Sequence, residues 1–269
     1  MEKIDFEAAL VEVAKLPMVR IDREQFLRKE LRNHYNKEVV DLAVSYNPAY
    51  AGIKNTDIDR IAKNCILAET RRVTIISAAA GVPGGVAMIG TVSADILQYF
   101  GHIIRILQEL IYLYGWQDLN LNESELDEET KNMLTLFIGI MFGISEAAKT
   151  VNRIAGAAAN QMAKKLPQKA LTKGTIYPIV KKISQILGVR MTKEIFANGV
   201  SKAVPVVGAI VSGGLTLFSF KAMAKRLKEY LSSLEIADVD FYKRACDEEY
   251  SDVEFEEISI INADYDDNR

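Results

Sequence analysis

Histidine, cysteine and tryptophan are scarce in this 269-residue chain, which contains two, two and one of them. The two cysteines, Cys65 and Cys246, lie far apart and fit neither a metal-binding nor a redox spacing. So few cysteines favour a reducing, cytosolic setting. The motifs of zinc proteases, serine hydrolases, P-loop proteins and dinucleotide-binding proteins do not occur. We therefore expect no metal, no cofactor and no catalytic residues.

Acids interrupt the first sixteen residues, which we therefore do not expect to act as a secretory signal. Two longer uncharged runs do occur, from Val73 to Ala94 and from Ala203 to Phe220. The first run, of 22 residues, exceeds the roughly 18–20 residues of a membrane span, and the second has 18. Both also contain Pro and Gly, and the first is divided by Gly-Val-Pro-Gly-Gly at residues 81–85. This pattern favours a helical hairpin over a span. Whether such a hairpin lies in a protein core or enters a bilayer stays open.

Apolar residues recur at helical spacing along most of the chain, and alternating strand patterns are missing. We predict an all-α fold, a multi-helix bundle with two Gly/Pro-rich helical hairpins and an acidic C-terminal tail. Long helices are expected over residues 57–80, 86–114 and 206–234, with Gly115 ending the second one. Acids at residues 127–129 predict another helix start, and the apolar run 133–144 after them should be buried.

Three parts are expected along the chain: N-terminal helices over 1–54, a helical domain over 55–234, and a partly disordered acidic tail over 235–269. Charge is segregated between them. Residues 147–228 carry fifteen Lys/Arg and one acid, whereas residues 229–269 carry three Lys/Arg and fourteen acids. Such segregation is informative about partners rather than about fold.

The basic segment has two interpretations. It is either the solvated outer face of its helices or a surface for an anionic membrane or lipid, because bases flank apolar helices there. Nucleic acid is an unlikely partner, since aromatic residues are sparse in the segment. The acidic tail either covers the basic segment or contacts a protein partner. The candidate anionic-surface contacts are Lys164, Lys165, Lys169, Lys173, Lys181 and Lys182.

Polar residues also form a stripe along one face of the helix expected over 86–114, opposite an apolar face. One interpretation is a solvated or purely structural face, held by pairs such as Arg105 with Glu109. The other is a functional polar groove, in its strongest form an acid–His–Arg constellation for proton transfer. No partner motif completes a catalytic triad. The candidate groove residues are Asp95, Gln98, His102, Arg105 and Glu109.

Two ordered motifs resemble those of the EcsC family. The first runs from the small-residue helix through the Gly-Val-Pro-Gly-Gly break to Tyr-Gly, and the second is the Pro-opened, Gly-rich run 203–220. The likeness covers roughly residues 55–230. It implies a bacterial helical protein that is cytoplasmic or membrane-associated, and it brings no agreed catalytic residues. The matching residues are Gly81, Pro83, Gly84, Gly85, Asp95, Tyr114, Gly115, Pro205, Gly208, Gly213 and Gly214.

The function expected from these features is that of a non-enzymatic, membrane- or lipid-associated helical protein at the inner face of the membrane. An accessory role in membrane transport or envelope function fits the resemblance. The first alternative is a soluble cytoplasmic scaffold or adaptor that binds a protein partner. The second is an enzyme that uses the Asp95, His102 and Arg105 stripe, which requires those side chains to converge in a site with shifted pKa values.

Overall fold

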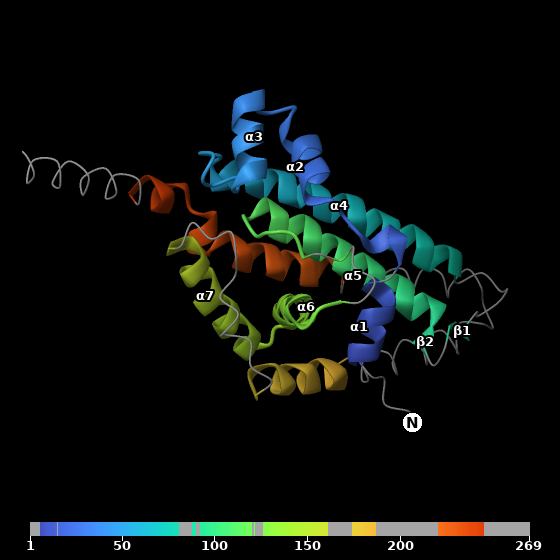
Figure 1. The fold of residues 1–269 in the computed structure, drawn as a ribbon. Helices are drawn as coiled ribbons and strands as arrows, with labels where there is room; N and C mark the ends of the chain where they lie inside the picture. Colours follow the sequence, from blue (N-terminus) through green and yellow to red (C-terminus); the bar gives the residue numbers. More distant parts are fainter. Residues whose placement is uncertain are drawn as a thin grey trace, which may run out of the picture.

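Two long antiparallel helices, α4 (Asn55–Ala80) and α5 (Ala94–Leu113), pack side by side through the molecule (Figure 1). The computed structural model describes residues 6–14, 16–80, 88–89, 92–119, 121, 126–160, 174–186 and 220–244. These residues are predominantly helical, which confirms the predicted all-α multi-helix bundle.

The N-terminal helices pack around α5. α1 (Phe6–Ala14), η1 (Pro17–Val19) and α2 (Arg23–Leu31) all pack on α5, and α3 (Lys37–Ser45) packs on α2. Side-chain caps start two of these helices. Asp22 accepts the Gln25 backbone N–H at 2.8 Å, and Asn36 accepts that of Val39 at 3.0 Å. These short helices therefore begin where their own caps place them.

Among the remaining helices, α6 (Glu128–Met141) packs on both α5 and α7 (Ser145–Asn160). These two are followed by helices over 174–186 and 220–232, by η3 (Glu235–Ala237) and by a short helix over 239–244. Asp127 caps α6, and residues 133–141 are all buried, as the apolar run predicts. Gly139 lets α6 and α7 approach closely, because a Cβ there would lie 2.8 Å from the Cβ of Ala147.

The first hairpin is partly corrected by the structure. α4 ends at Ala80, just before the Gly/Pro break, as predicted. The helix expected from residue 86 begins only at Ala94 and is preceded by an antiparallel pair, β1 (Met88–Ile89) with β2 (Val92–Ser93). β-branched residues such as Ile89 and Val92 favour such a strand pair over a helix start. The prediction of one helix from residue 86 is therefore wrong at its N-terminal end.

The C-terminal end of α5 follows the prediction. Gly115 has φ of 95°, a left-handed conformation that suits glycine. The Trp116 N–H donates to the Ile111 carbonyl at 3.0 Å and the Gly115 N–H to that of Tyr112 at 3.3 Å, which is the pattern of a Schellman cap.

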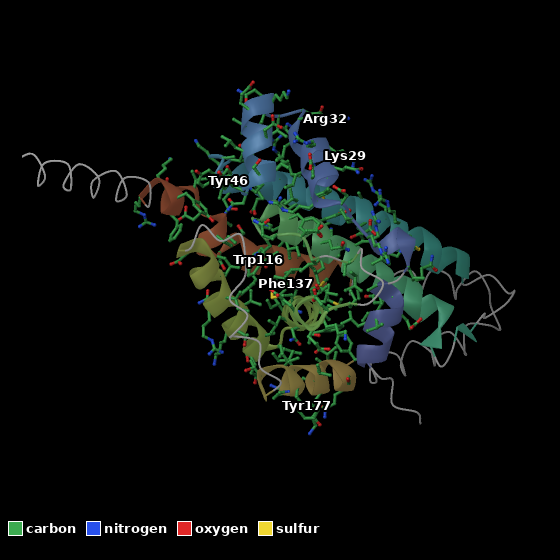
Figure 2. All side chains as sticks on the ribbon, viewed as in Figure 1. Lys29, Arg32, Tyr46, Trp116, Phe137 and Tyr177 are labelled. Carbon is green, nitrogen blue, oxygen red and sulfur yellow. The ribbon has the colours of Figure 1, made fainter. Side chains whose placement is uncertain are left out.

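Two sets of largely buried polar contacts tie distant segments of the chain together. The Arg23 guanidinium donates to the carbonyls of Trp116, Val44 and Tyr46 at 3.0, 2.7 and 3.0 Å. Lys228, on helix 220–232, donates to Asp59 at 2.8 Å. Trp116 itself packs edge-on against Phe137 of α6, with ring centroids 5.0 Å apart, near the centre of the molecule (Figure 2).

Several predicted features lie outside the described residues. They include the tip of the first hairpin at 81–87, the whole second hairpin with Pro205, Gly208, Gly213 and Gly214, and the tail beyond residue 244. The long helix expected over 206–234 is described from residue 220 onward and ends at residue 232, two residues before the predicted end.

Candidate functional site

The predicted polar groove lies on α5, and most of it is not solvated. His102 is 3% exposed and Glu109 is 7% exposed, while Gln98 is half-buried. The side chain of Asp95 lies outside the described residues. The solvated-face interpretation is therefore wrong for His102 and Glu109, because α4 packs against this face of α5.

The residue that organises the groove is Glu69, which the sequence analysis did not select. It lies on α4 and is fully buried. Its Oε1 lies 2.6 Å from His102 Nδ1 and 3.5 Å from Arg105 Nε, and its Oε2 accepts from Arg72 Nη1 at 2.6 Å. The sequence offered one hint of its importance, because Glu69 is the sole acid between residues 60 and 73. We call Glu69, Arg72, His102, Arg105 and Glu109 the Glu69 cluster.

The charge state of Glu69 follows from its partners. Burial raises the pKa of Glu69, but hydrogen bonds from His102 and Arg72 and the charge of Arg105 outweigh burial, so its pKa lies below the ordinary value. An ionised carboxylate only accepts hydrogen bonds, so the His102 Nδ1 carries a proton. The His102 Nε2 is buried and has no hydrogen-bond partner among the described residues. The imidazole is thus oriented by Glu69 through one nitrogen only.

Glu109 is the second carboxyl group of the cluster and behaves differently. Burial and the negative charge of Glu69 raise the pKa of Glu109 to about 7, although Arg105 and Arg72 oppose the shift. The Arg105 Nη2 lies 3.9 Å from the Glu109 Oε1, too far for a hydrogen bond. Two carboxyl groups in one interface therefore differ in ionisation, and Glu109 exchanges its proton near neutral pH.

Arg105 of the cluster and the neighbouring Gln108 also hold the N-terminal segment on α5. Arg105 Nη1 donates to the Met18 carbonyl at 2.5 Å. Gln108 accepts the Ile21 N–H at 3.1 Å and donates to the Val19 carbonyl at 2.8 Å. Part of the polar stripe therefore serves packing, as the structural interpretation of the stripe proposes.

Nucleophilic chemistry has little support in this cluster. Cys65 is buried on α4 in the same interface, and burial together with the charge of Glu109 raises the pKa of its thiol. Since the thiolate is the reactive form, such a cysteine is inert. Within the described part of the chain, no group of three or more His, Cys, Asp or Glu residues has the arrangement of a metal site.

The opposite side of α4 forms a basic surface. Its exposed positions between residues 60 and 72 follow the i, i+3, i+4 spacing of one helix face. This face carries four cations and no acid, and Leu67 at its middle is 42% exposed. Arg60 contacts Asp57 at 3.4 Å, and Arg72 is the cation that also reaches Glu69. The α4 basic face consists of Arg60, Lys63, Asn64, Leu67, Ala68, Arg71 and Arg72.

The basic residues selected from the sequence lie elsewhere. Lys181 and Lys182 are exposed on helix 174–186, where Lys182 pairs with Glu146 at 2.6 Å. Tyr177 on the same helix is 67% exposed and points outward (Figure 2). Lys164, Lys165, Lys169 and Lys173 lie outside the described residues. Helix 174–186 and α4 lie on opposite sides of the molecule, with α5 and α6 between them (Figure 1).

The structure describes some of the remaining motif residues and leaves others outside the described residues. Gly81, Pro83, Gly84 and Gly85 lie outside the described residues. Tyr114 and Gly115 are structural, because Gly115 ends α5 and the Tyr114 hydroxyl donates to Asp59 at 2.5 Å. The Asp59 carboxylate thereby links α4 both to the end of α5 and to Lys228.

Comparisons with family models, with curated proteins and with solved structures find no match. The resemblance to the EcsC family therefore stays a prediction that rests on the motifs themselves. Among the described residues, no helix has both the length and the apolar character needed to cross a membrane.

Proposed function

We propose that this chain is a non-enzymatic protein that associates with anionic membrane surfaces through the α4 basic face. The observation that carries the proposal is the composition of that face, with four cations, an exposed leucine and no acid over residues 60–72. The sole acid of the stretch, Glu69, is buried on the other side of the helix. A cluster of four Lys/Arg on one helix face is typical of contact with an anionic membrane surface.

The expected strength is modest. Each basic side chain near an anionic surface contributes about 1 kcal/mol. Four such side chains give about 4 kcal/mol at most, which corresponds to an affinity near the millimolar range. Leu67 adds a small apolar contribution if it enters the headgroup region. Reversible, salt-sensitive association is therefore expected, rather than insertion.

An anionic lipid surface fits this face better than a nucleic acid does. Non-specific nucleic-acid surfaces combine bases with aromatic side chains on which the nucleobases stack. The exposed positions of the α4 basic face include no aromatic residue. Its exposed apolar side chains, Leu67 and Ala68, are aliphatic, which suits lipid. An enzymatic role has less support, because the Glu69 cluster offers no reactive nucleophile among the described residues.

Vesicle flotation tests the proposal with two matched double variants. Lys63→Gln with Arg71→Gln removes two cations from the α4 basic face. Lys181→Gln with Lys182→Gln removes two cations from the opposite side of the molecule. On phosphatidylglycerol vesicles at low salt, we expect the first pair to weaken binding by about 30-fold, from about 1 kcal/mol per base.

The control pair and the lipid identity decide the outcome. The Lys181→Gln/Lys182→Gln variant should bind nearly as well as the parent protein. Vesicles of phosphatidylcholine alone should bind neither double variant nor the parent. Loss of binding in the second pair alone would move the membrane contact to helix 174–186. If the parent protein ignores anionic vesicles at low salt, the proposed function is wrong and the adaptor interpretation gains support.

A further inference from the structure

Arg72 belongs both to the α4 basic face and to the buried Glu69 cluster. Its side chain is 54% exposed, yet its Nη1 reaches the fully buried Glu69 carboxylate at 2.6 Å. The hydrogen bond to Glu69 and the charges of Glu69 and Glu109 raise the pKa of Arg72. The same guanidinium therefore lies within the field of both buried carboxyl groups while part of it faces solvent.

We propose that anionic headgroup binding at the α4 basic face is linked to proton uptake by Glu109 in the Glu69 cluster, with Arg72 as the shared cation. This inference rests on the proposed membrane association and adds its regulation by pH. A phosphate group attracts the Arg72 guanidinium as a carboxylate does. Headgroup and buried carboxylates thus compete for one cation.

The direction of the linkage follows from the charges. When Arg72 turns toward a headgroup, the cluster loses a positive charge and its carboxyl groups bind protons more tightly. Because linkage is reciprocal, protonation of the cluster in turn favours headgroup binding. Glu109 is the group that exchanges a proton near pH 7. Affinity for an anionic surface should therefore rise as pH falls through neutrality.

Charged and titratable groups face Glu109 from three helices in the described part of the chain. Arg105 lies on α5 itself, and α2 contributes Lys29 and Glu30. The groups on α4 are Cys65, Glu69 and Arg72. Lys29 pairs with Glu30 at 2.8 Å and Arg105 is held by the Met18 carbonyl, whereas Arg72 is the cation that the α4 basic face shares with the Glu69 cluster.

The magnitude follows from one linked proton. If departure of Arg72 raises the pKa of Glu109 by about one unit, binding strengthens about fivefold between pH 8 and pH 6. A phosphatidylglycerol headgroup keeps its charge across this range, so the lipid contributes no slope of its own. The same protonation should appear as proton uptake on binding.

Vesicle binding at pH 6, 7 and 8 tests the linkage in the full-length protein, with phosphatidylglycerol vesicles at constant ionic strength. Glu109→Gln mimics the protonated side chain and should bind at every pH as the parent protein binds at pH 6. Glu229→Gln, an exposed carboxyl on helix 220–232, is the matched control and should keep the parent slope. Isothermal titration calorimetry in two buffers of different ionisation enthalpy measures the protons taken up.

Each result has a distinct meaning. A fivefold slope in the parent protein that disappears in Glu109→Gln supports the linkage. Equal parent affinity at all three pH values overturns it while leaving membrane association in place. A slope that survives in Glu109→Gln overturns it as well, because another group then carries the proton. Absence of binding at every pH instead refutes the proposed function on which the inference rests.

Discussion

The buried carboxyl of Glu109 should make the protein less stable as pH rises through neutrality. Its pKa is about 7 in the folded protein, against 4.5 for an unperturbed glutamate. Between these two values the folded state binds more protons than the unfolded state. The free energy of unfolding therefore falls with rising pH, and the loss becomes complete above pH 7.

The size of the effect follows from the same two pKa values. Ionising Glu109 costs about 3 kcal/mol of stability at pH values well above 7. Part of that cost is already present at pH 5.5, so the loss between pH 5.5 and pH 8 is about 2 kcal/mol. Only 7% of this residue is exposed, so solvent screening reduces the figure little.

Urea denaturation of the parent protein and of Glu109→Gln at these two pH values measures the effect directly. The glutamine cannot ionise, so the stability difference between variant and parent should shift by about 2 kcal/mol in favour of the variant at pH 8. Comparing the two proteins cancels the pH dependence that comes from groups present in both. If parent and variant lose stability in parallel, Glu109 does not ionise in the folded state as described and the reasoning fails.

Two further predictions concern stability. Gly115→Ala should cost about 1–3 kcal/mol in urea denaturation, because φ is 95° and the new Cβ would lie 3.0 Å from the Ile236 carbonyl oxygen. Gly52→Ala is the control for backbone strain alone, because φ there is 79° and no atom lies within 4 Å of the new Cβ. If Gly52→Ala costs as much stability as Gly115→Ala, the close contact with Ile236 does not contribute. Asp59→Asn should cost about 2–3 kcal/mol by leaving the buried Lys228 ammonium without its carboxylate. Adding Lys228→Met to that variant should recover part of the loss, and a fully additive cost would show that the pair does not interact.

Local chemistry made several elements predictable. The Gly/Pro break after residue 80, the acids at the start of α6 and the glycine after α5 act through their own backbone or nearest turns. The sequence therefore predicted where α4 and α5 end and that α6 is buried. The start of α5 was less predictable, because the segment before Ala94 has a composition that suits either a helix or a short strand pair.

The burial of the polar stripe on α5 could not be predicted from local sequence. The spacing of the stripe on one helix face could be read from the sequence, but its burial depends on α4, a separate helix. His102 contacts the carboxylate of Glu69, which lies 33 residues away in the sequence, and no local pattern predicts that pairing. A lone acid on the apolar face of α4 was the available hint, and its meaning required the partner helix.

Charge shows the same division between sequence and tertiary structure. Counting residues located the basic segment at 147–228, because charge totals depend on composition alone. The α4 basic face lies in a part of the chain whose acids outnumber its bases, so counting concealed it. Which way a side chain points is decided by what its helix packs against. Packing α4 on α5 turned Glu69 inward and left four cations outside, and that arrangement exists only in the folded protein.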